Sequence, residues 1–304
     1  MKRKESRHKD FTLFLICRNN EERLKESIRI ILNECNGRDI IAFDTESEDN
    51  TGALLKKNGI KVIDIKLDEF GHGRTRNLAL KYSDSEILIF LNGDALPVRG
   101  WIGELLKSID GYDAAFSRQI PDKGCDPLRI TDLINHPYFG RNEDELICKG
   151  SNLPILFDTV SCAIKRESLM RINFPDVSFG EDYLWAHSVI KEGGGIVYSA
   201  NSIVIHSHPI YREPYNLIRR HFEEGRLRSF QREKFGVEYF IKFLPSAFLL
   251  DLITISGVNI SSREKINWLL REPFLRMLQL VSFFAGLNED RIPDIIKRRL
   301  IWSR

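Results

Sequence analysis

The chain has 304 residues, and its 45 lysines and arginines nearly balance 43 aspartates and glutamates, giving a formal net charge of +2. This length is enough for one large α/β domain with an appendage, and the charge balance argues against nucleic-acid binding through overall charge. The five cysteines are odd in number and show no C-x-x-C spacing. That usage predicts free thiols in a reducing compartment and no zinc cluster.

Targeting signals are absent from the pattern. Residues 1–10 form a charged polar stretch, expected to be a tail, and no apolar signal segment follows it. No uninterrupted apolar run reaches the roughly eighteen residues that a membrane-spanning helix needs. We therefore expect a cytoplasmic protein, and peripheral contact with the inner face of the cell membrane stays open.

Apolar strands alternate with helices from residue 11 to about residue 117. Strands are predicted at 11–16, 40–43, 61–65 and 87–91, and helices at 21–35, 50–58, 75–82 and 101–109. This alternation predicts an α/β fold with a mainly parallel sheet and helices on both faces. In such sheets, ligands bind outside the carboxyl ends of the strands.

The second half is less regular. A loop-rich segment, 120–153, is expected to contact an acceptor, and it precedes a strand at 159–164, a helix at 183–192, one or two strands at 195–205 and helices from about 215. We divide the chain into a catalytic domain, 11–236, and a C-terminal helical extension, 237–304. The apolar stripes of the extension at 243–255 and 274–284 fit packing on the domain or on a second copy. Together with the basic stretch 295–304, they also fit a helix lying on a membrane.

Polar side chains follow the second predicted strand. Asp44 and Ser47 stand at its carboxyl end, where carboxylate and hydroxyl groups can bind a nucleotide base or a ribose hydroxyl. The alternative is that Ser47 or Asp49 caps the next helix.

A glycine-rich turn opens the third predicted helix. Gly71 to Asn77 contains Arg74, Arg76 and Asn77, and free helix N–H groups with two guanidinium groups fit a diphosphate. An ordinary loop with solvated arginines is the alternative.

A single carboxylate, Asp94, comes just after the fourth predicted strand. Hard divalent cations such as Mg²⁺ or Mn²⁺ prefer carboxylate oxygens and bridge the phosphates of a nucleotide. The bound metal neutralises charge on a departing diphosphate. The alternative is a structural aspartate in the turn that leads to Pro97.

Two further motifs complete the candidate site. Glu181 and Asp182 begin a helix, where adjacent side chains point in different directions. One of them can therefore serve as a general base, and Asp182 is our choice. The alternative is that they stabilise the helix N-terminus.

His206 and His208 lie two apart at the end of a strand, on one face if the strand continues. One imidazole can join Asp94 on the metal, which suits Mn²⁺ better than Mg²⁺.

Taken in order, these segments resemble the family 2 inverting glycosyltransferases of the GT-A fold, and in particular their bacterial rhamnosyltransferase-like branch. The resemblance runs from about Phe11 to Gly225, through D-x-x-S-x-D-x-T (44–51), G-R-T-R-N-L (73–78), F-L-N-G-D-A-L-P (90–97), S-C-A-I-K-R (161–166), F-G-E-D (179–182) and V-I-H-S-H (204–208). It implies a nucleotide-diphospho-sugar donor, a divalent metal and a single displacement with inversion. Asp44 would then contact the base, Asp94 the metal and donor, and His206 the metal, while Asp182 would deprotonate the acceptor.

The chain departs from the family pattern at two places. The D-x-D motif is Asn92-Gly93-Asp94, and the first loop reads Ile16-Cys-Arg-Asn-Asn20. We expect transfer of a sugar from a UDP- or dTDP-linked donor to a saccharide or lipid-linked saccharide during synthesis of a surface polysaccharide. The alternatives are a nucleotidyltransferase, which lacks support from a glycine- and lysine-rich loop after the first strand, and a non-catalytic sugar-binding scaffold. A homodimer stays open.

Overall fold

The computed structural model describes residues 10–152, 154–230 and 237–301. Four expectations therefore fall partly outside the described residues. They concern the polar tail up to residue 9, the end of the loop-rich segment at 153, the end of the catalytic domain at 231–236 and the last three residues of the basic stretch.

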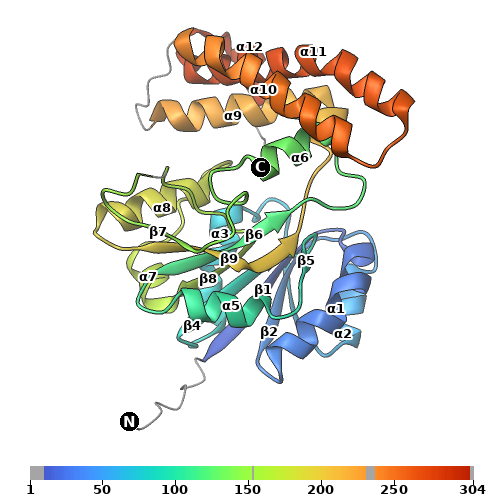
Figure 1. Ribbon diagram of the computed structural model, residues 1–304. Coiled ribbons are helices and arrows are strands. Elements are labelled where there is room, and N and C mark those ends of the chain that lie inside the picture. The colour runs from blue at the N-terminus through green and yellow to red at the C-terminus, as the bar shows by residue number, and fades with distance from the viewer. Residues whose placement is uncertain (1–9, 153, 231–236, 302–304) are drawn as a thin grey trace, which may run out of the picture.

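One nine-stranded sheet forms the centre of the molecule (Figure 1). Its strands are β1 (Phe11–Cys17), β2 (Ile40–Thr45), β3 (Lys61–Ile65), β4 (Ile87–Asn92), β5 (Leu96–Pro97), β6 (Ala114–Ile120), β7 (Glu145–Ile147), β8 (Ser161–Lys165) and β9 (Ile196–Ile205). They are ordered β3-β2-β1-β4-β8-β6-β9-β5, and β7 pairs with β9 at the side. The first four strands are parallel, as expected. Beyond them β8 is antiparallel to both β4 and β6, so the sheet as a whole is mixed.

Helices cover both faces of the sheet because successive side chains of a strand point to opposite faces. One face carries α1 (Glu21–Cys35), α2 (Thr51–Lys57) and α5 (Trp101–Ser108), and the other carries α3 (His72–Asn77), α4 (Ala79–Tyr82), α7 (Arg166–Arg171) and α8 (Glu181–Lys191). On the second face Phe14 stacks between Phe43 and Phe90, with ring centroids 5.6 Å apart in both pairs. The two apolar cores hold the strand ends, and the polar loops after them, in fixed positions.

A layer of helices lies over one end of the sheet, reached through β9 (Figure 1). It contains α9 (Pro214–Phe230), α10 (Val237–Gly257), α11 (Ser262–Leu287) and α12 (Asp294–Leu300), and the short helix α6 (Pro127–Ile134) lies beneath it. The helices α9 and α11 touch through glycines, since a Cβ on Gly225 would come within 2.0 Å of the Phe283 carbonyl oxygen and one on Gly286 equally near that of Phe222. A small third core, which includes Leu128, joins this layer to α6.

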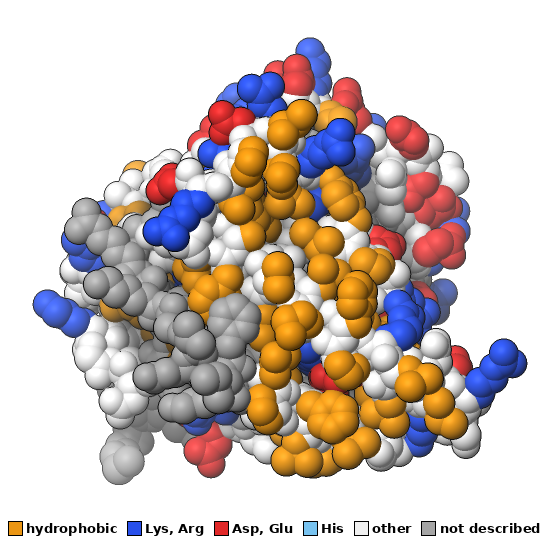
Figure 2. All heavy atoms as spheres, turned by 90° about the horizontal axis from the view of Figure 1, so that it is seen from above, with side chains coloured by type: hydrophobic (Ala, Val, Ile, Leu, Met, Phe, Trp, Pro, Cys, Tyr) orange, Lys and Arg blue, Asp and Glu red, His pale blue; other side chains and the backbone are white. Residues whose placement is uncertain are grey.

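The outer face of this layer exposes many apolar side chains (Figure 2). Along α11 these residues recur every three or four positions, at Ile266, Leu270, Phe274, Met277 and Val281, and Leu270 is 77% exposed. Such spacing places them on one side of the helix, opposite the side that buries Trp268 and Leu275. No helix in the described part of the chain is long and apolar enough to cross a membrane.

The structure differs from the sequence-based prediction mainly in the second half. Strands β5, β6 and β7 and helices α6 and α7 were not predicted. The β6 segment A-A-F-S-R-Q-I mixes small, polar and charged residues, so it lacks a clean period, and its register against β9 is irregular after Ser117. The predicted helix at 75–82 begins earlier, at His72, and is divided into α3 and α4 around Leu78.

Candidate active site

The register of the sheet brings the first two predicted motifs to one edge. Asp44 is opposite Cys17 in the β1–β2 pair, and Asn92 is opposite Ile16 in the β1–β4 pair. Burial, with added repulsion from Asp44 and Asp94, raises the pKa of the Cys17 thiol, which therefore lies within the field of both carboxylates. The predicted base-binding and metal-binding motifs thus flank one strand end.

A short strand pairing assembles the metal-ligand cluster. β5 pairs antiparallel with the end of β9, with Leu96 opposite Ile205, so the residues just before Leu96 and just after Ile205 meet. The Nε2 atoms of His206 and His208 each lie 3.6 Å from Oδ2 of Asp94. One ligand atom from each residue can be chosen so that all three lie within 4.8 Å of one another. A strand of two residues is too short for a periodic signal, so the sequence could not predict this contact.

The atoms of this cluster fit a divalent cation. Nε2 of His206 and Oδ1 of Asp94 are buried, and neither has a hydrogen-bond partner among the described residues. The other ring nitrogen of His206, Nδ1, lies 2.9 Å from Oε1 of Gln119 and donates to it in the tautomer that leaves Nε2 as a lone pair. Burial alone would raise the pKa of Asp94, but its interactions with His206 and His208, together with a backbone hydrogen bond, lower that pKa.

Contacts in the structure explain why asparagine and glycine occupy the first two positions of the N-G-D motif. Oδ1 of Asn92 accepts a hydrogen bond of 3.0 Å from Nη2 of Arg76. A Cβ on Gly93 would lie 2.4 Å from Oδ1 of Asn20 and 2.9 Å from Sγ of Cys17. The motif therefore keeps one carboxylate for the cluster, uses a neutral oxygen to bind Arg76 and allows close contact with the first loop.

Arg76 is a buried connector between two of the motifs. Its side chain is 1% exposed, and Nη1 lies 3.1 Å from Oε1 of Glu181. Its remaining contacts include the carbonyl oxygens of His72 and Thr159. These contacts join Arg76 to other protein groups, and its binding to a diphosphate stays a prediction.

Asp182 faces the same space as the metal-ligand cluster, whereas its neighbour Glu181 is held by Arg76. Gly180 caps α8 with φ 76°, and there is no room for a side chain at this position because a Cβ would meet Leu227 at 2.4 Å. Burial, together with repulsion from Glu181 and Asp158, raises the pKa of Asp182 well above the ordinary carboxyl range. Because the Glu181 carboxylate is paired with Arg76, the geometry favours Asp182 over Glu181 as the base, a role that stays a prediction.

The other predicted residues lie near this edge in different settings. Asp44 is buried and accepts a hydrogen bond from Ser47, and burial raises its pKa. Ser47 also accepts from the N–H of Asn19, so it ties the second loop to the first. Arg74 forms a 2.9 Å ion pair with Asp176 on the surface, and Asn77 exchanges two hydrogen bonds with the backbone of Phe174.

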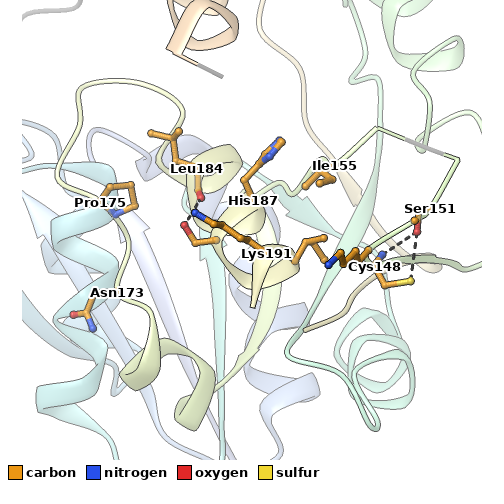
Figure 3. Close-up of a pocket in the computed structure, with 12 residues that line it drawn as sticks. Cys148, Ser151, Ile155, Asn173, Pro175, Leu184, His187 and Lys191 are labelled. Carbon is orange, nitrogen blue, oxygen red and sulfur yellow. Dashed lines mark hydrogen bonds between the residues drawn. The ribbon is translucent and has the colours of Figure 1, made fainter. Parts of the chain in front are cut away.

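A cavity of about 470 Å³ is lined by Arg76, Glu181, Asp182, His206 and His208 of the predicted site. Its wall includes residues from the predicted site and others that the sequence analysis missed, among the latter Gln119, Arg129, His136, Asp158, Arg220, Glu224 and Arg228. Most of the missed residues lie on α6, on α9 or in the loop before β8. These segments carry no motif of their own and reach the cavity only through tertiary packing. A second hollow of about 750 Å³ lies beside α8 between Cys148 and Lys191 and contains none of the predicted site residues (Figure 3).

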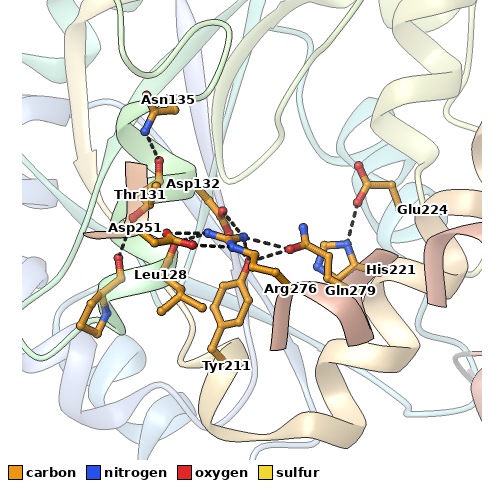
Figure 4. A network of polar contacts seen from close by, with 11 residues as sticks. Leu128, Thr131, Asp132, Asn135, Tyr211, His221, Glu224, Asp251, Arg276 and Gln279 are labelled. Atoms are coloured by element: carbon orange, nitrogen blue, oxygen red, sulfur yellow. Dashed lines mark hydrogen bonds and ion pairs between the residues drawn. The ribbon is translucent and has the colours of Figure 1, made fainter. Parts of the chain in front are cut away.

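A buried polar network holds the helical layer against the cavity wall (Figure 4). Arg276 of α11 donates two hydrogen bonds of 2.8 Å to Asp251 of α10 and one of 2.8 Å to Asp132 of α6. It also donates to the hydroxyl of Tyr211, which follows the His206–His208 segment. The extension is therefore joined both to α6 and to the segment that follows His206 and His208.

Comparison with known sequences places the chain in a family of sugar-transferring enzymes. The family described as Glycosyl transferase family 2 matches residues 12–172, which is more than half of the chain. The chain is 28% identical over 199 residues to the O-antigen chain rhamnosyltransferase RfbN of Salmonella typhimurium, covering 61% of this chain and 62% of that protein. It is 29% identical over 198 residues to WbaN, an O-antigen chain rhamnosyltransferase of Salmonella anatum, covering 61% of each. The match thus spans about three fifths of the length of these relatives.

Solved structures support the fold. The mannosyltransferase PcManGT from Pyrobaculum calidifontis, in complex with GDP-Man and Mn²⁺, is similar with a TM-score of 0.59 at 13% identity, over 93% of this chain and 88% of that one. Residues 1–349 of S. aureus TarS, in complex with UDP, give a TM-score of 0.52 at 15% identity, over 85% of this chain and 69% of that one. These neighbours confirm the predicted GT-A fold.

Proposed function

Because the chain belongs to glycosyl transferase family 2, we propose that it moves a sugar from a nucleotide-diphospho-sugar to a hydroxyl group of a saccharide acceptor, with inversion at the anomeric carbon. The observation that carries this proposal is the position of two groups on one cavity. His206 and His208 of the cluster with Asp94 lie on one part of its wall, and Asp182 on another. One place to hold a diphosphate and one base are what a single displacement needs.

Asp94, His206 and His208 would hold the divalent metal, Mn²⁺ or Mg²⁺. A carboxylate with two imidazoles favours Mn²⁺, and the contact with Gln119 orients His206 for binding through Nε2. When bound, the metal would neutralise charge on the diphosphate. In the same site Asp44 and Ser47 would bind the base or ribose, and Arg74, Arg76 and Asn77 stay as predicted donor contacts.

Asp182 would carry the proton in the reaction. As the acceptor oxygen forms its bond to the anomeric carbon, the hydroxyl proton passes to the Asp182 carboxylate. The bond from that carbon to the diphosphate breaks, and its electron pair stays on the diphosphate oxygen. Glu181 would position the start of α8 through its ion pair with buried Arg76. No enzyme nucleophile is needed.

The donor would be UDP- or dTDP-linked, and the product a surface polysaccharide. The family makes a nucleotidyltransferase the weaker alternative, since sugar transfer is the chemistry of the family. The similarity to O-antigen chain rhamnosyltransferases supports a deoxyhexose as the sugar and a saccharide as the acceptor.

A panel of nucleotide-sugars tests this function. We expect UDP- or dTDP-sugars to raise the melting temperature in the presence of Mn²⁺ and not with EDTA, because only the folded protein binds them. Asp94→Asn should abolish the metal-dependent part of the shift. Failure of every UDP-, dTDP- and GDP-sugar to stabilise the wild type would favour a non-catalytic scaffold instead.

The acceptor would be presented at a lipid surface, because the helical layer exposes the apolar stripe of α11 described above. Lys297, Arg298 and Arg299 in the last turn of α12 add positive charge to the same layer, which complements anionic lipids. We expect flotation with vesicles that contain anionic lipid and loss of flotation in a Leu270→Ser/Phe274→Ser variant. Leu67→Ser, an exposed apolar side chain away from this layer, is the matched control. If the double variant instead abolishes a dimer seen by light scattering, the surface is a contact between two copies.

A further inference from the structure

Two arginines of the cavity wall form no ion pair with any described residue. Arg129 comes from α6 and Arg220 from α9, and both line the cavity that contains Asp182 and His208. Among the described residues, neither guanidinium group makes a hydrogen bond or an ion pair, although Cζ of Arg220 lies 5.9 Å from the ring centroid of Phe179. Nε of Arg129 is buried without a hydrogen-bond partner in the same part of the chain.

Other arginines near the site differ in this respect. Arg74 is paired with Asp176, and Arg76 with Glu181. Burial of a guanidinium N–H without a hydrogen-bond acceptor, as at Nε of Arg129, costs free energy. With Arg220 on the same cavity wall, this donor indicates that the partner is a ligand.

The two guanidinium groups are electrostatically close to each other. Desolvation by the cavity wall, followed by the positive charge of Arg129, lowers the pKa of Arg220, although its side chain stays open to solvent. The negative charges of Glu224, Asp158 and Asp182 act on Arg220 in the opposite direction. Like charges held together in this way favour an anion with more than one negative charge.

We propose that Arg129 and Arg220 together bind a diphosphate group in this cavity. The inference rests on the proposed function, in which negative charge builds on the diphosphate as its bond to the sugar breaks. Guanidinium groups match phosphate oxygens in a two-pronged geometry and stay charged at neutral pH. The diphosphate belongs either to the nucleotide donor or to a lipid-linked acceptor, and the two sources share this chemistry.

The helical extension is then part of the binding site. Arg276 donates to Asp132 on α6, the helix that carries Arg129. The close packing of Gly225 and Gly286 against backbone atoms of the facing helix fixes α9, the helix that carries Arg220. Loss of the extension would release both arginines. This gives the C-terminal helices a role in anion binding that none of the motifs at the sheet edge predicts.

Calorimetry on the full chain with Mn²⁺ tests the proposal, with UDP, dTDP, UMP and farnesyl diphosphate as probes. Arg129→Gln and Arg220→Gln should each weaken diphosphate binding by about 10- to 100-fold, the range for a lost charge-assisted contact. UMP should be affected less. Arg99→Gln, an exposed arginine outside the cavity wall, is the control, and circular dichroism verifies that each variant is folded.

The outcomes distinguish failure of the arginine site from failure of the proposed function. Weaker binding of UDP or dTDP assigns the pair to the donor, and weaker binding of farnesyl diphosphate alone assigns it to a lipid-linked acceptor. Wild-type affinity of both variants for all three diphosphates would overturn the inference while leaving the proposed function intact. If the wild type binds no nucleoside diphosphate, the proposed function fails, and inorganic pyrophosphate with the same variants then decides whether the arginines form an anion site.

Discussion

Replacement of Arg276 by methionine should destabilise the protein strongly. The Arg276 side chain is 2% exposed, and that of Asp251, which accepts two of its hydrogen bonds, is fully buried. Methionine fills similar space but leaves the Asp251 carboxylate without its cation. It also removes the donors to Asp132 and Tyr211.

The expected loss follows from the burial of this pair. Removing one partner of a buried ion pair costs about 3–5 kcal/mol, because the other charge stays buried and uncompensated. That is a large part of the roughly 5–15 kcal/mol by which a typical protein is stable. Urea unfolding followed by far-UV circular dichroism measures the change, with the slope of the transition compared to verify a common mechanism.

Two further variants make this test specific. Arg263→Met changes an exposed arginine of the same helix and should alter stability by less than about 0.5 kcal/mol. Adding Asp251→Asn to Arg276→Met should recover about 1 kcal/mol or more, since the unpaired charge is then gone. A loss below about 1 kcal/mol for Arg276→Met, or no recovery in the double variant, would refute the reasoning.

Three other predictions concern the site and its support. Asp182→Asn should lower kcat about 10²- to 10⁴-fold, the usual contribution of a general base, with nearly unchanged donor affinity. Its melting temperature should rise, because a desolvated charge beside Glu181 is removed. Turnover within a few-fold of wild type in a radiolabelled transfer assay would exclude this role. Gly93→Ala should lower the unfolding free energy by about 1–3 kcal/mol, since its Cβ would collide with Asn20 and Cys17, and a neutral effect in urea unfolding would contradict the close contact. Burial, with repulsion from Asp251, raises the pKa of Glu272 from 4.5 to about 7, so its contribution to stability should fall as pH rises between those values. Glu272→Gln should therefore be more stable than wild type at pH 8 and similar at pH 4.5, and equal melting temperatures at pH 8 would argue against the shift.

The first half of the fold could be predicted because its signals are local. In strand Ile87–Asn92, residues 87–91 form a continuous apolar run, and a helix such as Glu21–Cys35 repeats apolar residues every three or four positions. Parallel strands bring their carboxyl ends to one edge, so the proximity of Asp44 to the N-G-D motif followed from the order of elements alone.

The rest depended on contacts that leave little trace in the sequence. The two-residue strand β5 sets Asp94 beside His206, but nothing in Leu96-Pro97 identifies a strand. The side of the cavity formed by Arg129 and Arg220 depends on how α6 and α9 pack under the helical layer. The role of the G-R-T-R arginines in diphosphate binding stays a prediction, and nothing in that motif indicates that Arg76 pairs with Glu181, 105 positions away.

The central claim is that Asp94, His206 and His208 hold the divalent metal of a sugar-transfer site. Pulsed electron paramagnetic resonance of the protein with Mn²⁺ and UDP tests it most directly, because nitrogen coupling to the metal reports an imidazole ligand. We predict nitrogen coupling in the wild type and a reduced coupling in His206→Gln, together with weaker Mn²⁺-dependent UDP binding. Bound Mn²⁺ with no nitrogen coupling in the wild type, or the same coupling after both histidines are replaced, would contradict the account.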